Sequence, residues 1–396
     1  MFIHKRNTFL IALLAVYCNG ITPFCNDIYL PSLPSIAHTF HTHHVTWMIS
    51  IFLFGLAVMQ LIFGPISDFF GRKKTQVVSL MLVFTGSILI IFSPYFSILL
   101  LGRFLQSIGC CGLLINGFAI IRDSFQQEAR AKVLGIYLGL LSFMPAAAPM
   151  IGSIVANYGV WQLDFMIIAG LSLFFLLIIT TKFQESMLQT NTQALNLKPL
   201  FVTYKNLLSN SQYLRYCLIS CLSYSALFTF LACSPYLLIG FLKCTALEYG
   251  YIMIIVATAF LIIGFNIATI IKVIPQKTLL AIAGLIMMLG SFLLYTWNHF
   301  SQPSLVSVIL PLYLIYIAIG LLRATASALA LDCTSSKNAG SASALFGFIS
   351  FIGASIAANL GPFAGSHPIH LALIVFAFGM SILVLALSLL KSRRQP

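Results

Sequence analysis

Twelve long apolar segments constrain what this chain of 396 residues can fold into. Hydrophobic residues make up 60% of the sequence and charged residues only 7%, a balance far from that of soluble domains. A helix needs about 20 apolar residues to cross a bilayer. Only helices and closed barrels satisfy their backbone in lipid, and these segments are too long for barrel strands. We therefore expect an all-α membrane protein. Its membrane-spanning helices are predicted at about 8–30, 46–67, 76–93, 97–121, 133–157, 160–181, 213–238, 247–271, 278–297, 304–330, 339–363 and 368–390.

The positive charges follow the loops between these segments. A net charge of +13 could indicate a nucleic-acid partner, but the cations alternate with the predicted helices. Of the 21 lysines and arginines, only Lys243, Arg103 and Arg323 fall outside the loops on one side. Cytoplasmic loops carry such an excess. We expect a multi-pass membrane protein with both termini cytoplasmic, and no nucleic-acid partner.

A polar interval at about 183–212 divides the predicted helices into two sets of six. We therefore expect an N-terminal six-helix bundle over 1–182, a cytoplasmic linker over 183–212 and a C-terminal six-helix bundle over 213–396. The linker is expected to hold a short interfacial helix near Leu200–Leu208.

Residues 64–74 read Gly-Pro-Ile-Ser-Asp-Phe-Phe-Gly-Arg-Lys-Lys and place one acid and three consecutive cations in a short turn. In a chain so poor in charge, that density needs a reason. A basic turn beside a membrane sets orientation, and an acid at a helix end can pair with a neighbouring helix.

This turn and six further motifs, in the same order along the chain, resemble the major facilitator superfamily and within it the Bcr/CflA branch of drug:proton antiporters. The resemblance covers essentially the whole chain. It implies a major facilitator fold of twelve helices, proton-coupled export across the bacterial inner membrane and no cofactor. The other six motifs lie at 26–34, 103–109, 119–123, 145–152 (the antiporter motif, with Pro145, Pro149 and Gly152), 328–332 and 339–345.

The chain also departs from the family pattern. Ala148 and Ser153 stand where glycine is expected near the antiporter motif, and Gln162 stands where arginine usually follows tryptophan. Arg323 stands where this branch usually carries an uncharged residue. These departures bear on substrate range and on the antiport assignment rather than on the fold.

Asp27 is the acid that lies within a predicted span, between Asn26 and Tyr29. A charge at the bilayer centre costs about 2.5–3.5 kcal/mol on insertion scales, so an intramembrane acid indicates function. Loss of water favours the neutral carboxyl, which suits a group that takes up a proton outside and releases it inside. The alternative is an acid at the external helix end, wetted by solvent.

Two arginines are also predicted inside spans. Arg103, at a depth similar to Asp27, could tune the proton affinity of that carboxyl or hold an anionic group of the substrate. It could instead snorkel to the interface or bond to backbone carbonyls. Arg323 is expected to snorkel or to pair with Asp332, with substrate contact as the alternative.

A cavity for apolar compounds needs aromatic walls with few polar groups. Each candidate could equally pack inside the protein or against lipid, and an asparagine could bond a neighbouring helix. The candidates are Asn116, Tyr137, Phe143, Met144, Tyr224 and Phe228.

The charged turn is expected to act as a conformational latch as well as an orientation signal. Asp68 could pair with a basic group or helix end in the other half, and Arg72 could pair with Asp123. Such pairs would hold an outward-open state. The latch residues are Gly64, Asp68, Gly71, Arg72 and Asp123.

Four histidines, His38, His41, His43 and His44, fall in the first predicted external loop. Such spacing can bind Zn²⁺ or Cu²⁺, although a wet loop that titrates with outside pH is the simpler interpretation.

The sequence therefore predicts a monomeric, proton-driven exporter of small, largely apolar compounds that works by alternating access in the lipid bilayer. A dedicated exporter of one metabolite, such as a siderophore or amino-acid derivative, is the alternative. Import of a nutrient with protons is disfavoured by the proline-rich motif. A sensor is disfavoured because there is no soluble signalling domain, and an enzyme because the spans show no catalytic constellation.

Overall fold

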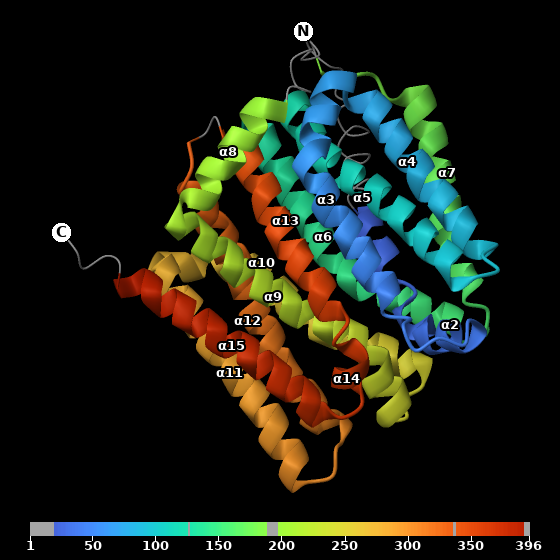
Figure 1. Ribbon diagram of the computed structural model, residues 1–396, viewed down its shortest axis with the longest axis vertical. Coiled ribbons are helices and arrows are strands. Elements are labelled where there is room, and N and C mark those ends of the chain that lie inside the picture. Colours follow the sequence, from blue (N-terminus) through green and yellow to red (C-terminus); the bar gives the residue numbers. More distant parts are fainter. Residues whose placement is uncertain (1–19, 126, 188–196, 336–337, 392–396) are drawn as a thin grey trace.

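The structure, a computed structural model, describes residues 20–125, 127–187, 197–335 and 338–391. Regular structure within these ranges is helical throughout (Figure 1). Helical residues 20–27 lead into the short helices η1 (Leu30–Ser32) and α2 (Leu33–Thr39). The remaining elements are α3 (Trp47–Phe70), α4 (Arg72–Ile91), α5 (Phe96–Ser124), α6 (Gln127–Ala156), α7 (Gln162–Lys182), α8 (Leu197–Ser209), α9 (Ser211–Pro235), the π-helix η2 (Tyr236–Phe241), α10 (Ala246–Val273), α11 (Gln276–Phe300), α12 (Leu305–Asp332), α13 (Ala339–Ala358), α14 (Gly361–Gly365) and α15 (Pro368–Lys391).

Ten of the described helices are long and apolar enough to cross a membrane. Together with α6, they occupy the predicted second to twelfth spans. The first predicted span begins outside the described residues, and its end is the helical stretch 20–27. Helix α8 lies where the interfacial helix was expected. The prediction of an all-α membrane protein is therefore confirmed.

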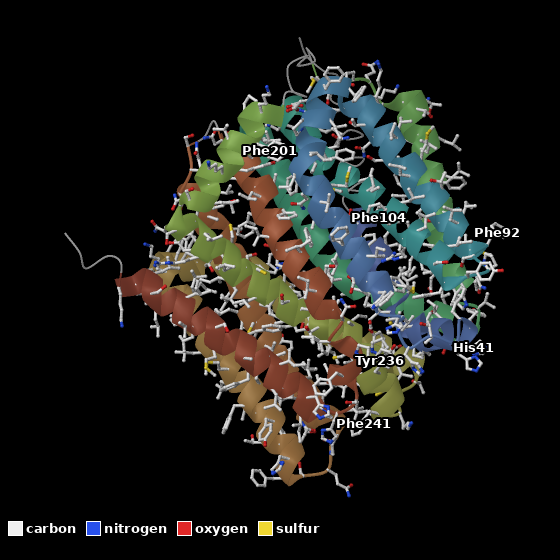
Figure 2. All side chains as sticks on the ribbon, viewed as in Figure 1. His41, Phe92, Phe104, Phe201, Tyr236 and Phe241 are labelled. Carbon is white, nitrogen blue, oxygen red and sulfur yellow. The ribbon has the colours of Figure 1, made fainter. Side chains whose placement is uncertain are left out.

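Apolar side chains also cover the outside of the molecule. Phe92, at the end of α4, is 76% exposed and Phe201 of α8 is 66% exposed (Figure 2). Such exposure would be a liability in water, but it is the expected surface of a protein whose solvent is lipid.

The described helices form two groups that meet along two helix pairs. Helices α3, α4, α5 and α7 pack in one group, and α9 to α13 pack with α15 in the other. The groups meet where α3 runs beside α13 and where α6 runs beside α10 (Figure 1). We call the end of the molecule with the α3–α4 turn the basic end, and the end with η1 and α2 the opposite end.

The α3–α13 pair is closed at the opposite end and open at the basic end. Ser355 of α13 donates to the carbonyl of Ser50 in the first turn of α3, 2.7 Å away. Farther along, the Gln60 amide lies against Gly347, where a Cβ would sit 1.6 Å from Oε1. Beyond this contact the two helices diverge around a cavity of about 590 Å³.

Candidate functional site

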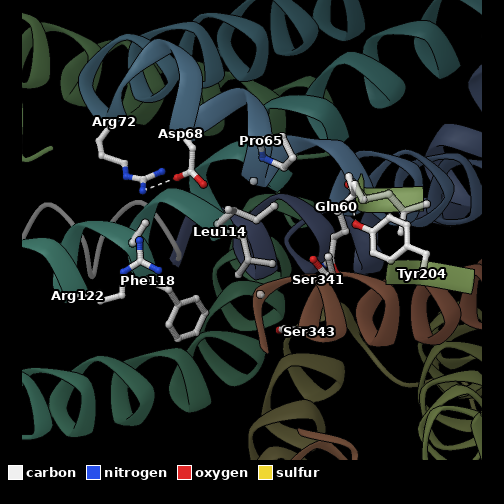
Figure 3. A pocket seen from close by; sticks show the side chains of 17 residues that line it. Gln60, Pro65, Asp68, Arg72, Leu114, Phe118, Arg122, Tyr204, Ser341 and Ser343 are labelled. Carbon is white, nitrogen blue, oxygen red and sulfur yellow. Dashed lines mark hydrogen bonds and ion pairs between the residues drawn. The ribbon is translucent and has the colours of Figure 1, made fainter. Parts of the chain in front are cut away.

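The basic-end cavity is bounded by α3, α5, α8 and α13 (Figure 3). Asp68 and Pro65 line its α3 side, and Ser341 and Ser343 in the first turns of α13 face them. Tyr204 of α8 closes one flank and donates to the carbonyl of Leu61, 2.8 Å away. The cavity therefore lies between the two helix groups at the end that carries the charged turn.

Asp27 lies at the last residue of the first helical stretch and is only 4% exposed. The side chain of Asn26 donates to its Oδ1 at 2.5 Å. Asp27 is therefore enclosed by protein. It is a helix-end acid, as the alternative interpretation proposed, but it is buried rather than wetted.

Asp27 is followed closely by the short helix η1, which begins at Leu30. This short helix contacts α6, α9 and α10. At Gly152 of α6 a Cβ would sit 1.6 Å from the carbonyl oxygen of Ile28, so only glycine permits this approach. Pro149 is buried beside it, and Ser153 bonds back to the Pro149 carbonyl at 2.7 Å. The antiporter motif therefore packs against the end of the first helix.

Arg103 is completely buried, and its guanidinium has four oxygen acceptors. Its guanidinium donates to the Cys25 carbonyl at 3.0 Å, to Gln106 Oε1 at 2.8 Å and to the Tyr29 hydroxyl at 3.1 Å. A fourth bond reaches the carbonyl of Met48 at 3.3 Å. This arrangement matches the interpretation in which arginine bonds to carbonyls.

Asp27 and Arg103 form no ion pair within 4.0 Å. The arginine nevertheless lies near the acid, because it bonds the Cys25 carbonyl and the Tyr29 hydroxyl, two residues before and two residues after Asp27. The structure therefore holds a cation near Asp27 without neutralising the acid directly. Tyr29 contacts Arg103 and does not line the basic-end cavity. It is fully buried, and its ring centroid lies 4.5 Å from Arg103 Cζ.

A second network occupies the basic end. Arg72 is 2% exposed, donates to Asp68 at 2.6 Å and lies 3.1 Å from Asp123 Oδ2. Its guanidinium also bonds Ser67, which donates to Asn116 of α5. Asn116, a cavity candidate from the sequence, is thus buried in this network and bonds a neighbouring helix.

Glu185, just beyond α7, completes this network. Its two carboxylate oxygens accept the backbone N–H groups of Arg72 and Lys73, each at 3.0 Å. A carboxylate at a helix N-terminus satisfies orphan donors and complements the helix dipole. Gly71 has φ of 89° and a Cβ there would lie 2.6 Å from Glu185, so both conformation and space require glycine.

A third group gathers around Arg323 of α12. It donates to the hydroxyl of Tyr224 at 2.9 Å and lies 4.4 Å above the same ring. Tyr224 stacks with Phe228 of α9 and meets Phe351 of α13 edge-on. Among the described residues, no acid, Asp332 included, lies within 4.0 Å of the Arg323 guanidinium.

The remaining cavity candidates are scattered. Phe143 is 52% exposed. Met144 lies against the first helical stretch, within 3.3 Å of a Cβ built at Gly20. The side chain of Tyr137 lies outside the described residues. The His38–His44 loop is exposed, with His41 at the edge of the fold (Figure 2), and the described residues contain no group of three or more potential metal ligands.

Sequence reasoning missed one buried acid, Asp164 in the first turn of α7. It is 0% exposed and accepts a hydrogen bond from Ser32 of η1 at 2.7 Å. Its other oxygen has no hydrogen-bond partner among the described residues. Its position three residues after Trp161, at the start of an apolar run, was the available signal.

Two groups of long apolar helices, with charged side chains buried between and within them, define a polytopic membrane transporter. The family model described as Major Facilitator Superfamily matches residues 13–358. The chain belongs to this superfamily, and the expected major facilitator fold of twelve helices in two bundles is thereby confirmed.

Individual proteins agree with this assignment. The chain is 26% identical to the "Uncharacterized MFS-type transporter YdgK" of Bacillus subtilis, over 89% of this chain and 87% of that protein. It is 28% identical to the "Multidrug resistance protein MdtL" of Salmonella schwarzengrund, over 69% of this chain and 68% of that one. A crystal structure of a D-xylose-proton symporter superposes with a TM-score of 0.77 at 16% identity, over 97% of each chain, and so shares the fold.

Proposed function

We propose that this transporter is a proton-coupled multidrug exporter of the Bcr/CflA branch, which expels small, largely apolar compounds across the bacterial inner membrane. The motifs support the branch, and the relatives named for multidrug resistance support efflux. The observation that carries the proposal is Asp27, a 4% exposed acid that has no ion-pair partner among the described residues. It is followed by η1, which contacts α9 and α10 of the other helix group.

The proton step follows from how Asp27 is covered. In the present conformation η1 is held against α9 and α10, and loss of water favours the neutral carboxyl. When the opposite end opens, those contacts separate and water reaches the acid. Asp27 would then exchange its proton with the outside. The movement of the two helix groups would therefore control when Asp27 is accessible to water.

We further propose that the basic end is cytoplasmic, that both termini lie there, and that one monomer works as two bundles, 1–182 and 213–396, joined by 183–212. In the outward-open state α3 and α13 would close at this end. Asp68 would then approach the N-terminus of α13, where the helix dipole favours a negative charge. Asp68 now bonds Arg72 of its own group, so this latch is open.

Transport by purified protein in proteoliposomes with an imposed pH gradient tests the proposal. A gradient of one pH unit can support up to about tenfold accumulation per coupled proton. We expect Asp27→Asn to reduce proton-driven accumulation to that of protein-free liposomes, because the amide cannot carry the proton. Normal accumulation by this variant would sink the proposal.

Asp332→Asn is the matched control, since Asp332 is an exposed acid at the end of α12 and undergoes the same chemical change. It should transport as the unchanged protein does. Cationic, neutral and zwitterionic compounds should be compared, because a dedicated metabolite exporter would accept one of them. Export of several unrelated apolar compounds would indicate a multidrug exporter, whereas export of a single compound would indicate a dedicated metabolite exporter.

A further inference from the structure

We infer that Arg323 and its aromatic neighbours form a binding site for an organic anion, so that the preferred substrate carries one carboxylate or similar group on an apolar aromatic body. This inference rests on the proposed function because it names the substrate class of the same transporter. Its basis is a difference in the hydrogen-bond acceptors that surround each inward-facing arginine.

Arg72 and Arg103 are buried, Arg323 is half-buried, and the three arginines differ in their acceptors. Arg72 has two carboxylates and a serine, and Arg103 has four oxygen acceptors. Arg323 has one, the Tyr224 hydroxyl. A guanidinium carries five N–H donors in a fixed fork, and Arg323 therefore keeps most of its donors for something other than the described residues.

Arg323 also faces the interior of its helix group rather than lipid. Seven residues separate it from Tyr316, which places both side chains on the same face of α12. Tyr316 is 3% exposed and packs on Phe230 and Phe260. Phe260 of α10 also lies under the Arg323 guanidinium, 5.7 Å from Cζ. Snorkelling to the membrane surface does not explain this position.

Tyr316 supplies a second polar group on that face. Its hydroxyl is buried and has no hydrogen-bond partner among the described residues. A buried hydroxyl left unpaired is costly, and it can donate to an anion held by the arginine two turns away.

The walls of the site fit the rest of such a molecule. Tyr224, Phe228 and Phe351 form a cluster of rings beside the guanidinium. Aromatic rings supply apolar area, while the planar fork of arginine matches a carboxylate with two parallel hydrogen bonds. A cation at this depth is expensive unless it is paired, and an anionic substrate would provide the missing partner.

Equilibrium binding of naphthoate and of its uncharged analogue naphthamide to the purified full chain tests this site. We expect naphthoate to bind about tenfold to a hundredfold more tightly, as a charge-assisted pair does over a neutral one. Arg323→Gln should abolish the preference, because it weakens the binding of naphthoate much more than that of naphthamide. Tyr224→Phe, which keeps the ring and frees another guanidinium donor, should retain the preference.

A second variant, Arg323→Lys, tests the site if the glutamine variant does not fold. Lysine keeps the positive charge but lacks the planar guanidinium that binds a carboxylate with two parallel hydrogen bonds. It should retain a smaller preference than the unchanged protein. Equal binding of the two probes, no binding of naphthoate, or a full preference in both arginine variants overturns the inference. Proton-driven export of neutral and cationic compounds, and its dependence on Asp27, is measured separately, so either proposal can fail alone.

Discussion

Arg103 shows at the residue scale how a buried charge can be structural. It is completely buried, and its donors meet carbonyl, amide and hydroxyl oxygens from three elements. Gln106, one of these partners, is held in turn by its own bond to Ser87 at 2.7 Å. The arginine thus joins α3, α4 and α5 to the end of the first helix.

Arg103→Met should lower stability strongly, because each buried partner left unsatisfied costs roughly 1–3 kcal/mol. Arg122→Met is the matched control, since Arg122 is 62% exposed and exposed ion pairs contribute roughly 0–1 kcal/mol. Thermal unfolding of both variants in detergent measures the difference. Equal midpoints would contradict a structural role for Arg103.

The sequence identified several of these residues but not their partners. Asp27 and Arg103 stand out because a charge inside an apolar segment is rare. Asp164 and Glu185 do not, because their burial and their bonds depend on Ser32 and on Arg72, each more than 100 positions away. The ring stack on Arg323 likewise depends on helices distant in the chain.

At the element scale, small residues decide how closely helices approach. Without a hydrophobic force between helices in lipid, close backbone packing supplies much of their attraction. Helices α4 and α5 use this device at Gly86, Gly102 and Gly109, where a Cβ would lie within 2.7 Å of a backbone oxygen in each case. The positions of these helices were predictable from their apolar length, whereas the depth of their contact was not.

Gly109→Ala should therefore destabilise the protein, because its new Cβ would lie 2.4 Å from the carbonyl oxygen of Ser79 and force α4 away from α5. Gly264→Ala in α10 is the control. Nothing lies within 4 Å of its Cβ, and alanine favours the helix by roughly 1 kcal/mol. The midpoint temperature of thermal unfolding should fall for Gly109→Ala and stay level or rise for Gly264→Ala. A reversed order would contradict the packing argument.

At the scale of the whole molecule, the membrane-spanning helices were predictable from apolar length. The way the two helix groups pack against each other was not. Periodicity and charge place each helix in the bilayer, but they carry no information on which end of the α3–α13 pair is closed. That depends on contacts between residues about 300 positions apart, such as Ser50 and Ser355. The cavity at the basic end is the consequence, since closure at one end leaves the helices apart at the other.

A disulfide between Ser50→Cys and Ser355→Cys should therefore lock the opposite end shut, because Ser355 Oγ already lies 2.7 Å from the Ser50 carbonyl. Alternating access requires this contact to break, so we expect transport in proteoliposomes to stop on oxidation and to return on reduction.

A third substitution, Ser341→Cys in the cavity wall, should stay reactive towards a water-soluble maleimide while the disulfide is formed. The parent chain with only its native cysteines gives the background for both measurements. Undiminished transport with the disulfide fully formed would show that the α3–α13 contact does not have to open.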